Sequence, residues 1–270
     1  MSTILSSMEP WDLVAEGYAE VTMKLFQAYT DHALALTRLN EQSHILDLAC
    51  GPGTLALTAA DKVANVKALD FSSEMIDILN RTQKVDSIRN IDTHCGDGQS
   101  LPYVDNCFDA AFSMFGLMFF PDRMKGYKEI LRTLKPGGET VISSWAPVSD
   151  SPVMQAVFGA LKAMNPTIPD PQEEIESLEN PDFFLREMVE AGYVDVQILA
   201  SDKDMEIDSI ETFWEDMVKG SAPIVMMKNS MPEDLWREKN KIALEYLYDT
   251  IGNTKTLSAK AWLAYGRKAR

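Results

Sequence analysis

Two carboxylates and a glycine turn stand close together between residues 47 and 70. Asp47 lies within the apolar run His44 to Leu48, and the segment GPGTLA, Gly51 to Ala56, follows it. Glycines at a turn let the backbone approach a ligand closely, and a helix that begins near Thr54 would offer free amide groups. With Asp70 as a partner for ribose hydroxyls, the spacing matches the relaxed dinucleotide fingerprint G-x-G-x-x-G/A.

The fingerprint alone is compatible with NAD, FAD and S-adenosylmethionine (SAM). Asp47 distinguishes SAM from the two cofactors that contain a pyrophosphate. A pyrophosphate at the start of the helix would be repelled by a carboxylate so near. SAM has no phosphate, and its ammonium and sulfonium groups are both cationic. A carboxylate at the end of this strand can attract that positive end, or hold the glycine loop open through backbone hydrogen bonds. We therefore favour SAM and keep an NAD-dependent oxidoreductase as the alternative.

Alternating strands and helices must position these residues. Apolar runs predict strands at His44–Leu48, Val66–Leu69, Ile91–His94, Ala110–Met114, Thr140–Ser144, Asp195–Leu199 and Ala259–Gly266. Helical spacing predicts helices over Glu9–Arg38, after Gly53, after Ser72, over Arg123–Leu134 and over Phe183–Ala191. This alternation is typical of an α/β protein with a doubly wound, mostly parallel sheet and helices on both faces.

The segment ILDLACGPGT resembles motif I of the class I SAM-dependent methyltransferases, and the resemblance continues over most of Leu13 to Trp145. VKALDFSSEMI, HCGDGQSLPYVDNCFDAAFS, FFPD and EILRTLKPGGETVI are similar to their following segments, in the same order. Among small-molecule types, the chain is distantly like the ubiquinone/menaquinone-biosynthesis enzymes. The resemblance implies a Rossmann-like fold of seven strands with an N-terminal helical cap and inserted helical lid segments. Ala49 stands where many members have glycine and is small enough to be tolerated.

The resemblance also implies roles for individual residues. Asp70 would accept hydrogen bonds from both ribose hydroxyls, and Phe71 and Met75 would flank the adenine. Asp97 would meet the adenine amino group, and the Gly98 amide a ring nitrogen. Aromatic residues of the N-terminal helix would close over the methionine end. The expected cofactor-binding residues are Trp11, Tyr18, Asp47, Ala49, Gly51, Gly53, Asp70, Phe71, Met75, Asp97, Gly98, Gln99, Met114 and Phe115.

Four segments are expected along the chain: an N-terminal helical cap (1–40), a SAM-binding core (41–146), a helical insert (147–182) and the end of the core sheet (183–270). The last segment carries an insert at about 200–253. Parallel sheets bind ligands beyond the carboxyl ends of their strands, so this insert is expected to cap the acceptor side. A packing appendage is the alternative. Its candidate acceptor-binding residues are Phe213, Trp214, Met226, Met227 and Met231. The flexible thioethers of the three methionines adapt to irregular apolar ligands.

No catalytic residue or metal ligand is identified. Transfer from SAM mainly requires alignment of the acceptor, and His32, His44 and His94 are expected to be structural. The segment SMFGLMFF lacks the Asn/Asp-Pro-Pro-Tyr element of nucleobase amino-methyltransferases, and its apolar character points to a small organic acceptor. Quinone methylation is one possibility, although the quinone enzymes' Tyr-Asp-x-Met-Asn and Glu-x-Ser segments are absent. A non-catalytic SAM-fold partner protein is a further alternative.

Composition narrows the setting. The 270 residues carry a formal net charge of −16, which argues against an extended nucleic-acid-binding face. Three cysteines form neither a disulfide framework nor a metal pattern and fit a reduced, cytoplasmic environment. The first residues do not resemble a secretion signal, and the longest apolar run is too short to span a bilayer. We expect a monomer or homodimer that acts on a small molecule, without nucleic acid or membrane partners.

Overall fold

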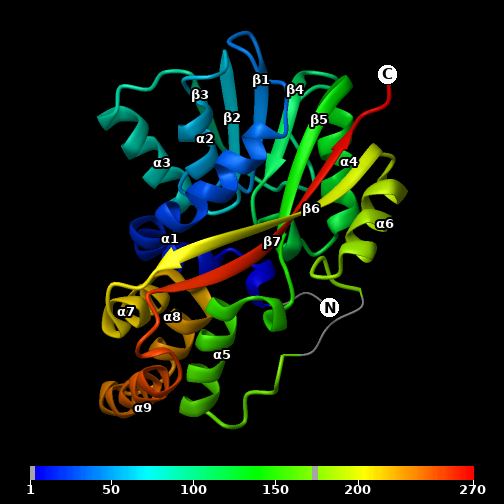
Figure 1. Ribbon diagram of the computed structural model, residues 1–270. Coiled ribbons are helices and arrows are strands. Elements are labelled where there is room, and N and C mark those ends of the chain that lie inside the picture. Colours follow the sequence, from blue (N-terminus) through cyan, green and yellow to red (C-terminus); the bar gives the residue numbers. More distant parts are fainter. Residues whose placement is uncertain (1–3, 172–175) are drawn as a thin grey trace.

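The computed structural model describes residues 4–171 and 176–270. Within them the chain forms a seven-stranded sheet in the order β3-β2-β1-β4-β5-β7-β6 (Figure 1). Its strands are β1 (His44–Leu48), β2 (Asn65–Asp70), β3 (Ile91–Cys95), β4 (Phe108–Ser113), β5 (Leu134–Trp145), β6 (Val194–Glu206) and β7 (Thr256–Arg267). Strands β1 to β5 run parallel, and β7 is antiparallel to both β5 and β6. The expected mostly parallel α/β sheet is confirmed.

Helices cover both faces of the sheet because side chains along each strand alternate in direction. In β1, Ile45 packs in the core beneath α1, α2 and α3, whereas Leu46 and Leu48 pack in the opposite core with α4 and α6. The helices are α1 (Glu9–Ala35), α2 (Thr54–Ala59), α3 (Ser73–Val85), α4 (Arg123–Thr133), α5 (Pro152–Met164), α6 (Pro181–Ala191), α7 (Ile210–Gly220), α8 (Ala222–Asn229) and α9 (Glu233–Ile251), with short 3-10 turns η1 (Ile4–Ser6), η2 (Leu117–Phe119) and η3 (Val148–Asp150).

A third group of helices, α5, α7, α8 and α9, lies beyond the carboxyl ends of the parallel strands (Figure 1). The sixth strand was expected to end at Leu199, but β6 continues to Glu206 because it pairs with β7 along this length. The helices of the insert therefore begin at Ile210. Residues 1–3 of the expected cap and 172–175 of the expected insert at 147–182 lie outside the described residues.

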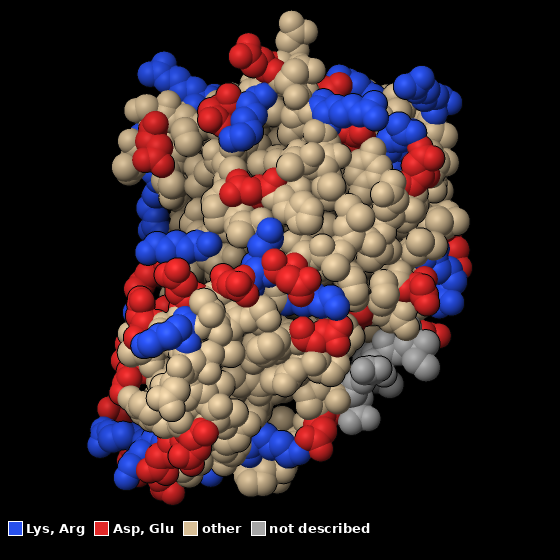
Figure 2. Space-filling model, in the orientation of Figure 1, with Lys and Arg blue, Asp and Glu red and all other residues tan. Residues whose placement is uncertain are grey.

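The face drawn in Figure 2 mixes acidic and basic side chains, and acidic ones gather over the end of β6 and α7. Exposed members of this acidic group include Asp204, Glu206, Asp208 and Glu211. The described part of this face lacks a broad basic patch of the kind that binds phosphate backbones. Across the described ranges 4–171 and 176–270, no helix is both long and apolar enough to cross a membrane.

Candidate active site

A cavity of about 240 Å³ lies at the carboxyl edge of the sheet. The strand order reverses between β1 and β4, and such a switch point is where doubly wound sheets leave a crevice for ligands. Segments after β1, β2, β3 and β4, together with α1, contribute its walls. Twelve predicted residues line it: Trp11, Tyr18, Ala49, Gly51, Asp70, Phe71, Met75, Asp97, Gly98, Gln99, Met114 and Phe115. The fold thus brings together side chains spread over a hundred residues of chain.

Asp70 ends β2 and reaches the cavity wall, although only 5% of the residue is exposed. One carboxylate oxygen accepts the Gly51 amide at 2.8 Å, and the other accepts the Ser72 amide at 2.9 Å. A carboxylate has about four acceptor positions, so capacity remains for a ligand. Burial raises the pKa of Asp70 to about 6, while the backbone amides act in the opposite direction. Asp70 therefore joins the loops after β1 and β2 and still presents an acceptor to the cavity.

Asp47 and Gly53, two of the predicted cofactor-binding residues, do not line the cavity. Asp47 follows the alternation of β1 and points toward α2, where its carboxylate accepts the Ala56 amide at 3.0 Å. Of the two expected roles, the structure has Asp47 hold the helix start that follows the glycine turn. Burial raises its pKa to about 7. Gly53 has φ +95°, and a Cβ there would lie 2.3 Å from Leu79 Cδ1, so this glycine allows close packing against α3.

The switch point holds two non-glycine residues in the left-handed region, Ala49 (φ 55°) and Phe115 (φ 57°). This conformation explains why a glycine is common at the first position, since it costs an L-residue roughly 1–2 kcal/mol. Such strain persists only where surrounding structure imposes it, typically at ligand sites. Gly116 allows the loop after β4 to pack closely against Ala49, because a Cβ on Gly116 would lie 2.3 Å from Ala49 Cβ.

Gly116→Ala is expected to lower the free energy of unfolding by about 1–3 kcal/mol, the usual cost of overpacking. Adding Ala49→Gly should recover most of this loss, because it removes the atom against which the new methyl group collides. Ala49→Gly alone should have a small effect, since relief of left-handed strain offsets the added chain entropy. Urea unfolding of the four proteins measures the coupling. Additive effects would show that the two loops do not touch as described.

The loop after β3 is ordered by its own side chains. Asp97 accepts the backbone amide of Gln99 at 2.8 Å, and Gln99 Oε1 accepts the Asp122 amide at the start of α4 at 3.0 Å. A Cβ on Gly98 would lie 2.6 Å from Phe120 Cζ, so the loop presses against the segment after η2. These contacts leave the Gly98 backbone on the cavity wall.

Aromatic residues from the N-terminal helix close the cavity. The Trp11 ring lies 5.0 Å from that of Phe119, centroid to centroid, and its Nε1 donates to the Leu5 carbonyl at 2.9 Å. A Cβ on Gly51 would lie 4.0 Å from Tyr18 Cε1, so the tyrosine ring covers the glycine turn. The Ser72 hydroxyl donates to Asp12 at 2.6 Å and ties α1 to the start of α3. Helix α1 is thus fastened over the ligand cavity.

Residues 45–138 match a family described as a methyltransferase domain. The match begins in β1, ends in β5 and includes the glycine turn, Asp70 and the Asp97 loop. Residues 45–138 therefore form a methyltransferase domain, and the sheet that contains them has the Rossmann-like fold expected of SAM-dependent methyltransferases.

Curated relatives share this domain. A demethylmenaquinone methyltransferase from Bacillus licheniformis is 36% identical over 124 residues, which make up 45% of this chain and 53% of that protein. One from Staphylococcus epidermidis is 35% identical over 124 residues, 45% of this chain and 51% of that protein. The chain spans about half the length of the curated relatives it matches, so the similarity concerns the methyltransferase domain.

Solved structures resemble more of the chain. The YcgJ protein from Bacillus subtilis has a TM-score of 0.59 at 18% identity and covers 89% of this chain and 99% of its own. The [4+2]-cyclase SpnF has a TM-score of 0.55 at 22% sequence identity, and the match covers 90% of this chain and 81% of that one. A third neighbour is phosphoethanolamine N-methyltransferase 2 of Haemonchus contortus, crystallised with phosphomonomethylethanolamine and S-adenosylhomocysteine (SAH). It has a TM-score of 0.55 at 16% sequence identity, and the match covers 90% of this chain and 52% of that one. These identities establish a shared fold.

Eight residues that line the cavity were not predicted from the sequence: Ser6, Leu48, Leu69, Gly96, Gly116, Phe119, Phe120 and Pro121. Leu48 and Leu69 sit at the carboxyl ends of predicted strands, so extending the strand-end rule to them would have found both. Phe120 and Pro121 belong to the FFPD segment. Ser6 carried no signal, because its position depends on how α1 is docked.

The expected acceptor-binding residues of the insert do not line this cavity. Phe213 and Trp214 are 4% and 1% exposed and pack with Leu247 in the core formed by the helices beyond the sheet. The insert contacts the site only indirectly, since Ala222 packs in the same small core as the cavity residue Met75.

His32 lies away from the cavity, with Nδ1 2.9 Å from the Ser201 hydroxyl. The described lining residues include no His, Lys or Cys. The described ranges also hold no cluster of three metal-ligating groups.

Proposed function

We propose that this protein binds SAM in the cavity and transfers a methyl group to a small organic acceptor by in-line displacement. The observation that carries the proposal is Asp70, a buried carboxylate on the cavity wall with acceptor positions left over after two backbone amides. A vicinal pair of ribose hydroxyls is the neutral donor pair that would use them. Failure of Asp70 to contribute to SAH affinity would remove this support.

The remaining residues fit the rest of the ligand. Phe71 and Met75 would flank the adenine, and Asp97 with the Gly98 amide would read its edge. Gly51 has φ +53° and no side chain between its backbone and the Tyr18 ring, whose Cε1 would lie 4.0 Å from a Cβ there, so the methionine part can approach the backbone. Trp11 and Tyr18 would cover that end.

When bound, SAM supplies an activated methyl group on a cationic sulfonium. The protein's own contribution is alignment and exclusion of water, which can account for roughly 7–11 kcal/mol of a barrier. The walls that would do this are the rings of Tyr18, Phe115, Phe119 and Phe120. The described lining residues that could act as general bases, Tyr18, Asp70 and Asp97, are all assigned to the cofactor in this proposal. The acceptor is therefore best matched by a group that is nucleophilic without deprotonation.

An NAD-dependent oxidoreductase is disfavoured by the start of α2. A pyrophosphate needs free amides in the first helical turn, but the Ala56 amide is already bonded to Asp47. Fold does not dictate activity, and a neighbour with this fold is named a [4+2]-cyclase. A role other than methyl transfer, including that of a non-catalytic SAM-fold partner, is therefore kept as the alternative.

The acceptor class rests on the apolar cavity walls. The named relatives methylate demethylmenaquinone, which keeps quinone methylation among the alternatives, but two segments of the quinone enzymes are absent from this chain. A small apolar acceptor and a monomer or homodimer are the arrangement that we propose.

Titration calorimetry with SAH and with NADH tests cofactor choice. Binding of SAH without binding of NADH is expected, and the reverse result would overturn the proposal. Transfer of labelled methyl from SAM into the small-molecule fraction of a cell extract tests catalysis. Tight SAH binding without transfer to any fraction would favour the non-catalytic alternative.

A further inference from the structure

The loop between β3 and β4 connects the cavity to a cluster of charged residues on α4. Its first residues, Gly96 to Gln99, line the cavity, and residues 100–107 run on without helix or strand. The loop is longer than the typical connection in a compact domain, which has about four to six residues.

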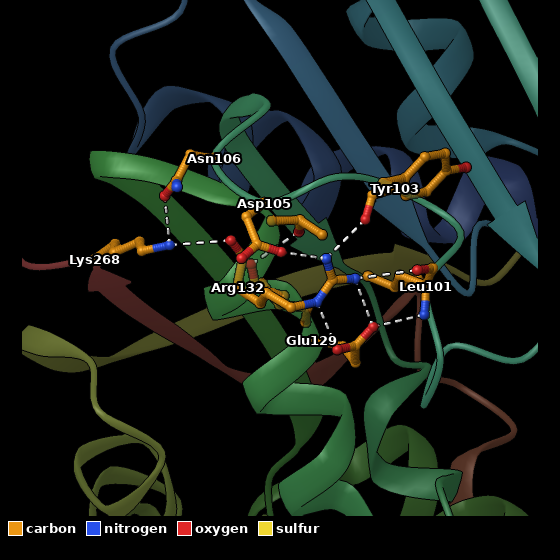
Figure 3. Close-up of polar contacts among 9 residues, drawn as sticks. Leu101, Tyr103, Asp105, Asn106, Glu129, Arg132 and Lys268 are labelled. Atoms are coloured by element: carbon orange, nitrogen blue, oxygen red, sulfur yellow. Dashed lines mark hydrogen bonds and ion pairs between the residues drawn. The ribbon is translucent and has the colours of Figure 1, made fainter.

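Arg132 uses every donor that it has, two on Glu129 of its own helix and three on this loop. Its guanidinium binds both carboxylate oxygens of Glu129 at 2.8 Å each. It also donates to the carbonyls of Tyr103 at 2.7 Å and Leu101 at 3.1 Å, and to the carboxylate of Asp105 at 2.8 Å (Figure 3). Five donors in a rigid fork are the full inventory of an arginine.

Glu129 completes the clamp from the other side. Its second oxygen accepts the Leu101 amide at 2.7 Å, so one Arg–Glu pair holds both backbone polar groups of Leu101. The Leu101 side chain is 6% exposed and packs in the same core as Ile130. Leu101 follows Gln99 by only two residues, so its position limits where the cavity residues can lie.

The same helix holds the cavity end of the loop. Gln99 accepts the Asp122 amide, and Gly98 lies against Phe120 just before α4. Helix α4 therefore fixes the loop at two points on either side of Ser100. The proper placement of Asp97 and Gly98 depends on both.

We propose that Arg132 and Glu129 are positioning residues for adenine recognition, holding the 96–107 loop so that Asp97 and Gly98 meet the edge of the base. This inference rests on the proposed SAM site. A merely structural pair would lower stability without changing how the cavity discriminates one base from another.

Arg132→Lys tests the inference, because it keeps the charge but loses the planar fork. Arg123→Lys is the matched control. Arg123 also lies on α4 and makes a similar bidentate contact, but with Glu187 of α6 instead of the loop, at 3.0 and 2.9 Å. Calorimetry compares SAH with S-inosylhomocysteine, in which an oxo group replaces the adenine amino group. Glu129→Gln is the second variant should Arg132→Lys fold poorly.

In Arg132→Lys, the preference for SAH over the inosine analogue should shrink about tenfold, equivalent to one misplaced hydrogen bond. Arg123→Lys should keep the wild-type preference even where its melting temperature falls. An unchanged preference in both Arg132→Lys and Glu129→Gln would overturn the positioning role while leaving the SAM site intact. Failure of the wild-type protein to bind SAH would instead remove the proposed function and this inference together.

Discussion

Asp70→Ala is expected to weaken SAH binding about a hundredfold at pH 8. A hydrogen bond to a charged acceptor contributes roughly 1.5–3 kcal/mol, so losing two bonds at the lower end of this range costs about 3 kcal/mol, close to the roughly 2.7 kcal/mol of a hundredfold change. The loss also frees the Gly51 and Ser72 amides, which loosens the two loops that the carboxylate joins. Asp92→Ala, at an exposed carboxylate on β3 that pairs with Lys67, is the control and should bind normally. Unchanged affinity in Asp70→Ala would contradict the ribose assignment.

The affinity should also depend on pH through the same group. Since the pKa of Asp70 is raised to about 6, the free protein carries the charged acceptor above that pH and the weaker, protonated one below it. SAH affinity is therefore expected to be level between pH 7 and 8 and to fall by up to about tenfold per unit below pH 6. Calorimetry across pH 5–8 measures the slope. The slope should disappear in Asp70→Ala, and a persisting slope would assign it to another group.

Asp47→Asn is expected to raise the free energy of unfolding at pH 8 by about 2–4 kcal/mol. Burial raises the folded pKa of Asp47 to about 7 from a usual value of 3.8. The folded state thus holds this proton more tightly than the unfolded chain, so stability falls as pH rises from about 4 to 7. Asparagine carries no charge there and can still accept the Ala56 amide through its oxygen.

The gain should shrink to under about 1 kcal/mol at pH 4, where the wild-type carboxyl is protonated in the folded state. Urea unfolding at pH 4 and 8 makes the comparison. Asp109→Asn is the control, because Asp109 accepts the His44 amide but also pairs with Lys135 near the surface, and it should not gain stability. A loss of stability in Asp47→Asn at both pH values would show that the charge itself stabilises the fold.

The Asp47→Asn variant also separates the two roles considered for this carboxylate. If the Asp47 carboxylate attracts the positive end of the ligand, the substitution should weaken binding of SAM more than binding of SAH, because only SAM carries the sulfonium. A role limited to holding α2 would affect both equally, and the Asp47–Ala56 contact favours this second outcome.

Local sequence was sufficient wherever neighbouring residues decide the structure. The run His44–Leu48 forms β1 with the predicted bounds, because its apolar residues and the glycine turn specify a buried strand and its end. Asp70 stands at the end of a strand just before Ser72, whose hydroxyl caps α3 as the N-cap preference predicts. These short-range signals were enough to predict the α/β fold and to direct attention to the carboxyl edge of the sheet.

Tertiary structure decided what depends on partners distant in the chain. The extension of β6 to Glu206 follows from pairing with β7, fifty residues away, and Trp214 is buried by helices of the insert that no local pattern places against it. Asp47 faces α2 instead of the cavity because strand alternation and the docking of α2 set its direction together. Arg132 reads as an ordinary helix residue in sequence, yet it holds carbonyls about thirty residues away. Sequence therefore determined which residues surround the strand ends. Packing between distant segments determined which of these residues face the cavity and which instead hold the surrounding helices and loops in place.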